Sequence, residues 1–112
     1  MKPKCYISGK ITGLPESVVI NNFLDAENLI KNDFTPVNPI KFIPENLKAY
    51  TVENWKEAMK ICMAELIDCE AVVFMSNFTK SKGSMIEHYY AFKTHMKRIY
   101  IDDNFHIVEV YE

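Results

Sequence analysis

The sequence has few of the residues that mark specialised scaffolds. Its 112 residues include three glycines, three cysteines and one tryptophan, and they show no internal repeat and no low-complexity tract. The cysteines Cys5, Cys62 and Cys69 form no Cys-x-x-Cys pair, and each lies in an apolar run. This pattern argues against a disulfide framework and predicts buried, reduced thiols in a cytoplasmic protein.

Long apolar runs and an excess of one charge are also lacking. No run approaches the roughly 20 residues that span a bilayer. The first four residues lead into a short strand rather than into the apolar segment of a signal peptide. The net charge is −2 and the lysines are scattered. We therefore expect no membrane partner and no nucleic-acid polymer as partner, although a small phosphate-bearing ligand needs only a local site.

The composition is that of an ordinary globular protein. Apolar residues make up 48% of the chain and charged residues 25%. A chain of this length can bury one core, whereas two cores separated by a linker would both be too small. We therefore expect residues 1–112 to fold as a single domain.

Apolar periodicity predicts strands and helices in alternation. Strands are expected at 5–7, 34–37, 71–75, 98–101 and 106–111, and helices at 17–32, at 84–96 and from an N-cap at Thr51 through Leu66. The segment Ile40 to Tyr50 has no clear period and is expected to be a loop. The unbroken apolar run Ala71 to Met75 is typical of a strand buried on both faces.

The order of these elements indicates the fold class. Alternation of this kind predicts an α/β domain with a doubly wound, mostly parallel sheet of four or five strands and helices on both faces, as in Rossmann-like and flavodoxin-like folds. The last strand follows a tight turn and is expected to be an antiparallel edge. In such sheets ligands bind beyond the carboxyl ends of the strands, where the strand order reverses.

Three loops that follow expected strands carry glycine, hydroxyl and amide groups. Glycine allows a ligand to approach the backbone, and loops that open onto helices direct N–H groups toward phosphate or sugar oxygens. The alternative, that these residues only form turns, is also open. The candidate ligand-binding residues are Ser8, Gly9, Lys10, Ile11, Thr12, Gly13, Asn38, Pro39, Ser81 and Gly83.

Several common sites are not indicated. The spacing Gly9-x-x-x-Gly13 lacks the third glycine of the dinucleotide fingerprint and the Gly-Lys-Ser/Thr ending of a Walker A loop. The histidines and acidic residues show no metal-ligand spacing, and no nucleophile elbow is recognisable. We therefore expect no metal and no cofactor.

The third expected helix carries the acidic residue of most interest. Met85, Tyr89, Phe92 and Met96 recur at helical spacing and are expected to form its buried stripe. Glu87 falls roughly opposite this stripe, so periodicity alone makes it a solvated surface residue. Its place in the first turn, next to the loop, is what would let it face a pocket at the edge of the sheet.

Four segments, taken in order, carry a resemblance to a known family. They read Tyr-Ile-Ser-Gly-Lys-Ile-Thr-Gly at 6–13, Asn-Pro at 38–39, Trp55, and Ser-Lys-Gly-Ser-Met-Ile-Glu at 81–87. From about Tyr6 to Ile101 the chain resembles the nucleoside 2-deoxyribosyltransferase-like superfamily, and most closely its small bacterial and phage members.

The resemblance implies an activity and roles for several residues. A glutamate at the place of Glu87 attacks the anomeric carbon of a deoxyribose, the base leaves, and the glycosyl group passes to another base or to water. Serine at the place of Ser81 helps to bind the phosphate in the members that hydrolyse deoxynucleoside monophosphates. The loop from Ser8 to Gly13 would contact phosphate or sugar, with Tyr6 near the nucleophile. We therefore expect an N-glycosidase (a hydrolase) or a deoxyribosyltransferase of nucleotide metabolism, with Glu87 and Tyr6 as catalytic residues.

Two departures from the family pattern keep a second function open. Cys62 stands where members often carry an aspartate, and Met85 stands where the best-known enzymes have a glycine. A nucleotide-binding module, a sensor or a sequestering protein, would use the same pocket without turnover. The resemblance also implies a homodimer or a higher homo-oligomer, and the aromatic segment Phe42 to Tyr50 is expected to be a lid or a subunit contact.

Overall fold

The computed structural model describes residues 1–48 and 51–112. In chain order the elements are β1 (Lys4–Ser8), α1 (Glu16–Ile30), β2 (Thr35–Val37), the 3₁₀ turns η1 (Pro39–Lys41) and η2 (Glu45–Leu47), α2 (Val52–Ile67), β3 (Ala71–Phe74), η3 (Ser76–Lys80), α3 (Lys82–Lys93), β4 (Lys97–Ile101) and β5 (Ile107–Tyr111). The expected loop Ile40 to Tyr50 contains η1 and η2, and its last two residues, 49 and 50, lie outside the described residues.

Within the described residues, five strands form one sheet in the order β2-β1-β3-β4-β5. β1 pairs in parallel with β2 and β3, and β3 pairs in parallel with β4, whereas β5 is antiparallel to β4. The sheet is therefore mixed, which corrects the expectation of a mostly parallel one, whereas the expected antiparallel strand at the edge is confirmed. The physical reason is the tight turn at 102–106, in which Asp102 Oδ1 accepts hydrogen bonds from the backbone N–H groups of Asn104 and His106.

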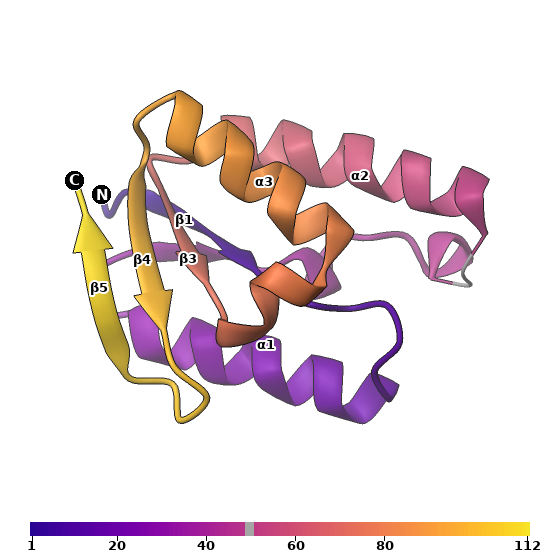
Figure 1. Ribbon diagram of the computed structural model, residues 1–112, viewed down its shortest axis with the longest axis horizontal. Helices are drawn as coiled ribbons and strands as arrows, with labels where there is room; N and C mark the ends of the chain where they lie inside the picture. The colour runs from indigo at the N-terminus through magenta and orange to yellow at the C-terminus, as the bar shows by residue number, and fades with distance from the viewer. Residues whose placement is uncertain (49–50) are drawn as a thin grey trace.

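The sheet lies between α1 on one face and the pair α2 and α3 on the other (Figure 1). On the α1 side, Val19, Phe23, Ala26 and Ile30 pack against side chains that include Cys5, Ile7, Ala71 and Val73. On the opposite side, Leu66 and Ala91 pack against side chains that include Tyr6, Val72 and Phe74. All four residues of β3 have no exposed surface, as expected for a strand covered on both faces. Among the described helices, none is long and apolar enough to cross a membrane.

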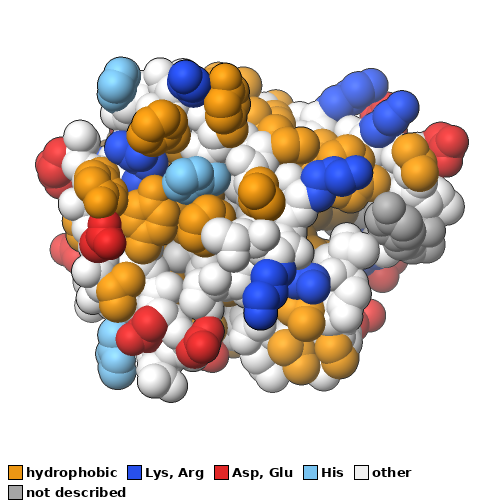
Figure 2. Space-filling model, in the orientation of Figure 1, with side chains coloured by type: hydrophobic (Ala, Val, Ile, Leu, Met, Phe, Trp, Pro, Cys, Tyr) orange, Lys and Arg blue, Asp and Glu red, His pale blue; other side chains and the backbone are white. Residues whose placement is uncertain are grey.

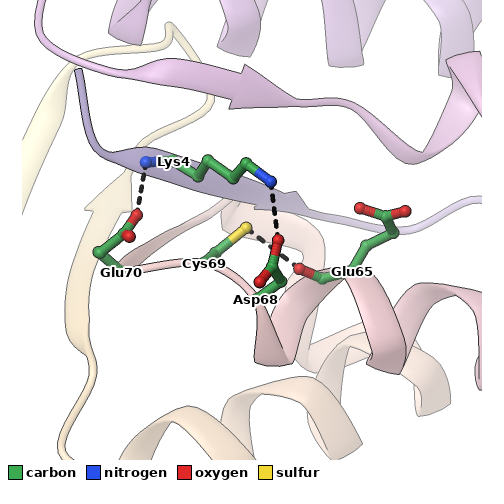
Figure 3. A network of polar contacts seen from close by, with 5 residues as sticks. All are labelled: Lys4, Glu65, Asp68, Cys69 and Glu70. Carbon is green, nitrogen blue, oxygen red and sulfur yellow. Dashed lines mark hydrogen bonds and ion pairs between the residues drawn. The ribbon is translucent and has the colours of Figure 1, made fainter. Parts of the chain in front are cut away.

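The start of β1 is tied to the turn between α2 and β3 (Figure 3). The backbone N–H of Lys4 donates to Glu70 Oε2 at 2.6 Å, and its Nζ lies 2.7 Å from Asp68 Oδ2. Next to them the Cys69 thiol donates to the backbone carbonyl of Glu65 at 3.2 Å. The ion pair is exposed and contributes little to stability. The contacts nevertheless align β1 with β3 at the end of the sheet away from the loops that follow these strands.

The buried face of α3 is not the expected one. Met85, Tyr89 and Phe92 are 52%, 64% and 52% exposed, whereas Glu87 and Ala91 are buried. The prediction of a buried stripe was therefore wrong for these three side chains, whereas Met96, the fourth, is partly buried against the core. Figure 2 shows that apolar side chains gather instead on the outer surface formed by α3, β4 and β5.

Close packing explains which face of α3 is buried. Its first turn approaches α2 so closely that a Cβ on Gly83 would lie 3.0 Å from Met59 Sδ. The face turned inward also carries Ser84 and Ala91, whose side chains are small. Helical periodicity records where apolar residues recur, but the space between the helix and its neighbours decides which residues fit.

The reversed face of α3 predicts unequal costs for two truncations. Leu66→Ala in α2 removes a fully buried side chain and should lower the free energy of unfolding by about 2–5 kcal/mol. Phe92→Ala in α3 should change it by no more than about 1 kcal/mol, because half of the ring is exposed and its partner is Arg98 at 5.2 Å. Urea unfolding followed by circular dichroism measures both. Equal costs for the two variants would contradict the described packing of α3.

Candidate functional site

A cavity of about 310 Å³ opens at the carboxyl edge of the sheet. Its walls come from the loop at 9–14, the first turns of α1, the segment 39–48, the amino-terminal half of α2 and the start of α3. These segments converge because parallel strands end at the same edge, and β2 and β3 flank β1 at the point where the strand order reverses. In Figure 2 the surface is hollowed to the right of centre, beside the start of α3.

A single carboxyl group, that of Glu87, lies at the buried end of this cavity. Glu87 is 5% exposed, and each of its two oxygens accepts one hydrogen bond from β1. The Tyr6 hydroxyl donates to Oε2 at 2.6 Å, and the Ser8 hydroxyl donates to Oε1 at 2.7 Å. The two donors fix the orientation of the carboxyl group, because Tyr6 and Ser8 point to the same face of the strand.

The electrostatics of Glu87 place its titration near neutral pH. Burial raises its pKa from 4.5 to about 7, and the hydrogen bonds from Tyr6 and Ser8 lower the pKa in part. Burial and the neighbouring Glu87 carboxylate also raise the pKa of Tyr6 well above its usual value. The tyrosine hydroxyl therefore stays protonated and remains a hydrogen-bond donor when Glu87 ionises.

A thiol lies beside this pair. Cys62 of α2 is 5% exposed, lines the cavity and packs in the same core cluster as Tyr6. Burial raises the pKa of the Cys62 thiol to about 12, so the group is neutral at physiological pH. It cannot supply the charge that an aspartate would supply at this position.

Glycine and a helix cap shape the remaining wall. Gly13 has a φ of +89°, a conformation that favours glycine, and Gly9 leaves room for the side chain of Met75. Ser81 is the N-cap of α3, and its Oγ accepts a hydrogen bond from the Ser84 backbone N–H at 3.2 Å. The first turn of α3 thus begins at the cavity.

Most of the residues predicted for the site do line the cavity: Tyr6, Gly9, Ile11, Thr12, Gly13, Pro39, Ser81, Gly83 and Glu87. Three others do not. Ser8 lies behind Glu87 and holds it, the backbone N–H of Lys10 donates to Asn77 Oδ1 at 3.0 Å, and Asn38 caps η1 and donates to Glu27. Glu87, whose spacing alone predicts an exposed position, is the most deeply placed acidic group of the cavity.

Sequence reasoning missed part of the wall. Trp55, Met59 and Cys62 lie on one face of α2 and all line the cavity. Their spacing of four and three residues is the signal that puts them on a common face. Ser84 also lines the cavity, and its position three residues before Glu87 is the signal that puts the two on one face of α3. Within the described part of the chain, no three His, Cys, Asp or Glu side chains group closely enough to hold a metal ion.

Comparison with known proteins identifies a family but no function. Residues 3–100 match the family model of a domain of unknown function, DUF4406. No curated protein and no solved structure matches the chain.

The raised pKa of Glu87 predicts how stability depends on pH. The folded protein keeps the Glu87 proton up to about pH 7, whereas the unfolded chain releases it near pH 4.5. The free energy of unfolding should therefore fall as the pH rises between these values, by an amount on the order of 3 kcal/mol, and should level off above pH 7. Glu87→Gln should abolish this fall, as measured by urea unfolding between pH 4 and 8. The exposed Glu53→Gln variant is the control, and parallel curves for Glu87→Gln and wild type would contradict the burial of an ionisable Glu87.

Proposed function

Because this chain belongs to the DUF4406 family of domains of unknown function, its activity has to be inferred from its site, and we propose that it cleaves the N-glycosidic bond of a nucleoside or a nucleoside 5′-monophosphate. The observation that carries the proposal is the Glu87 carboxyl group, buried at the end of a cavity and held by two hydroxyl donors. The resemblance to the nucleoside 2-deoxyribosyltransferase-like superfamily places the nucleophile at this same residue.

The proposed reaction has two displacements. In the first, an oxygen of the Glu87 carboxylate forms a bond to the anomeric carbon while the carbon–nitrogen bond breaks, and the base leaves with the electron pair and takes a proton from water. In the second, water or a nitrogen of another base attacks the anomeric carbon, the bond from this carbon to the Glu87 oxygen breaks, and the attacking group loses its proton to solvent as the carboxylate is released. Tyr6 and Ser8 keep the carboxylate aligned through both steps, because each holds one of its oxygens.

The walls of the cavity suit a nucleotide. Its volume is within the range of small-molecule sites, and apolar side chains such as Ile20, Phe23 and Trp55 line it, which favours a flat base. The cavity is also lined by Ser81, the N-cap residue of α3. The amino-terminal end of a helix and a neutral hydroxyl favour a phosphate, in agreement with the role that the resemblance gives to Ser81.

The topology supports the same proposal. The strand order β2-β1-β3-β4-β5 is that of flavodoxin-like, doubly wound folds, which bind their ligands at the switch between β1 and β3. The three free thiols, Cys5, Cys62 and Cys69, fit a cytoplasmic protein. The homo-oligomer implied by the resemblance is part of the proposal. In the segment expected to be a lid or subunit contact, Ile43 and Leu47 line the cavity wall.

A second function is favoured by one observation. Cys62 is a neutral, buried thiol where members of the resembled superfamily often carry an aspartate, so this position supplies no carboxylate. A nucleotide-binding module that senses or sequesters its ligand would use the same cavity without turnover. Calorimetric binding of a nucleotide that is then recovered intact would support this alternative.

The proposed reaction predicts release of free base. Nucleosides and their 5′-monophosphates, in ribose and deoxyribose forms, are incubated with the protein alone and with an acceptor base, and the products are separated by chromatography. Release should fall at least about 10³-fold in Glu87→Gln, because the amide cannot form the glycosyl ester. It should persist in Glu53→Gln, which removes an exposed carboxylate from the first turn of α2. Binding without release by the wild-type protein would favour the non-catalytic alternative.

The same chemistry predicts a pH profile. The nucleophile must be ionised, so the rate should fall about tenfold for each pH unit below the Glu87 pKa of about 7 and should be constant above it. Tyr6→Phe removes a hydrogen bond that lowers this pKa, and the midpoint should move to higher pH. Steady-state rates between pH 5 and 9 give both midpoints. A midpoint near pH 4.5 in the wild-type protein would show that a different group controls the rate.

A further inference from the structure

A buried hydroxyl in the cavity wall lacks a partner. Ser84 lies in the first turn of α3, lines the cavity and is 2% exposed. Its backbone N–H donates to Ser81 Oγ, but within the described residues its own Oγ has no hydrogen-bond partner. Burying a hydroxyl without a partner is unfavourable and uncommon in folded proteins, so this group needs an explanation.

The position of Ser84 relative to Glu87 explains why its hydroxyl is unpaired. Residues three apart on a helix lie on the same face, with Cβ atoms roughly 5–6 Å from each other. Both side chains are buried and line the same cavity. A ligand whose reacting carbon rests on the Glu87 carboxyl group therefore places the neighbouring atoms of its ring near this face of α3, where a rotation of the Ser84 side chain about χ1 turns its enclosed Oγ toward them.

The stereochemistry of the reaction identifies these neighbouring atoms. In a β-nucleoside the base projects from one face of the furanose ring, and the 2′- and 3′-hydroxyls project from the other. Displacement of the base places the nucleophile on the face opposite to the base, which is the face that carries the hydroxyls. The wall that supplies Glu87 thus faces the sugar hydroxyls, and the 2′-hydroxyl is attached to the carbon next to the reacting one.

We infer that Ser84 Oγ binds the 2′-hydroxyl of the sugar and makes the site selective for ribose over 2′-deoxyribose. The inference rests on the proposed function, because that function places Glu87 at the anomeric carbon. It departs from the deoxyribose that the family resemblance implies. With ribose bound, Ser84 gains the partner that it lacks in the free protein. With 2′-deoxyribose the hydroxyl stays unpaired, and a site with an unpaired buried polar group discriminates against that ligand.

The test compares matched sugars on matched variants. The four common ribonucleoside 5′-monophosphates and their 2′-deoxy counterparts are assayed for binding by calorimetry and for base release by chromatography. The wild-type protein should favour the ribose member of its best pair by roughly tenfold or more. Ser84→Ala should reduce this ratio toward one, mainly by weakening the ribose ligand. Ser17→Ala, which removes an exposed hydroxyl from α1, should leave the ratio unchanged.

Thermal unfolding of the free proteins separates a ligand-binding role from a structural one. Ser84→Ala removes an unpaired buried hydroxyl, so its unfolding midpoint should equal or exceed that of the wild-type protein. A midpoint that falls as far as that of Leu66→Ala would give Ser84 a structural role and overturn the inference.

The remaining outcomes separate the inference from the proposed function. Base release from both sugars at equal rates, or a ratio that Ser84→Ala does not change, overturns the role of Ser84 and leaves the proposed reaction in place. Preferential binding of ribonucleotides without any base release supports the role of Ser84 in binding the 2′-hydroxyl and overturns the proposed reaction. The absence of both binding and release overturns both.

Discussion

The burial of one carboxyl group against two hydroxyls of β1 is the constraint on which the site depends. The Glu87 side chain extends from α3 to the sheet, where the hydroxyls of Tyr6 and Ser8 donate to its two oxygens from one face of β1. Without these donors, a carboxyl group with 5% exposure would be desolvated and uncompensated. The same contact fixes the rotation of α3 about its axis, and this rotation decides which side chains of the helix reach the cavity and which remain outside.

The parts of the fold that follow from local patterns could be predicted from the sequence. The Thr51 cap is present, with its Oγ1 accepting from the Asn54 backbone N–H, and the run at 71–74 is the fully buried strand that its composition indicates. The face of α3 could not be predicted, because Met85, Tyr89 and Phe92 satisfy helical periodicity yet are exposed. The antiparallel edge strand, by contrast, was predictable, because β5 follows the tight turn at 102–106 and pairs with β4 in the opposite direction.

Some residues of the candidate site could likewise be predicted from the sequence, and others could not. Positions directly after strands, such as Gly9, Thr12 and Pro39, were predictable because parallel strands end at one edge of the sheet. Loop sequence does not reveal which polar groups are already hydrogen-bonded to the protein, and for this reason Lys10 and Asn38 were expected in the wall but lie outside it. The depth of Glu87 needed the tertiary structure, since no local pattern distinguishes a carboxylate facing water from one facing a cavity.

The small, polar inner face of α3 has a consequence for how the domain responds to its ligand. The fully buried residues of α3 are Ser84, Glu87 and Ala91, so the polar contact of Glu87 is a main part of the attachment of this helix to the sheet, together with the contact of His88 with Tyr100. Under the proposed function, a ligand that contacts Glu87 would stabilise the attachment of this helix, because binding and attachment would then be linked equilibria. The exchange of the α3 backbone amides with solvent would accordingly slow when the ligand is bound.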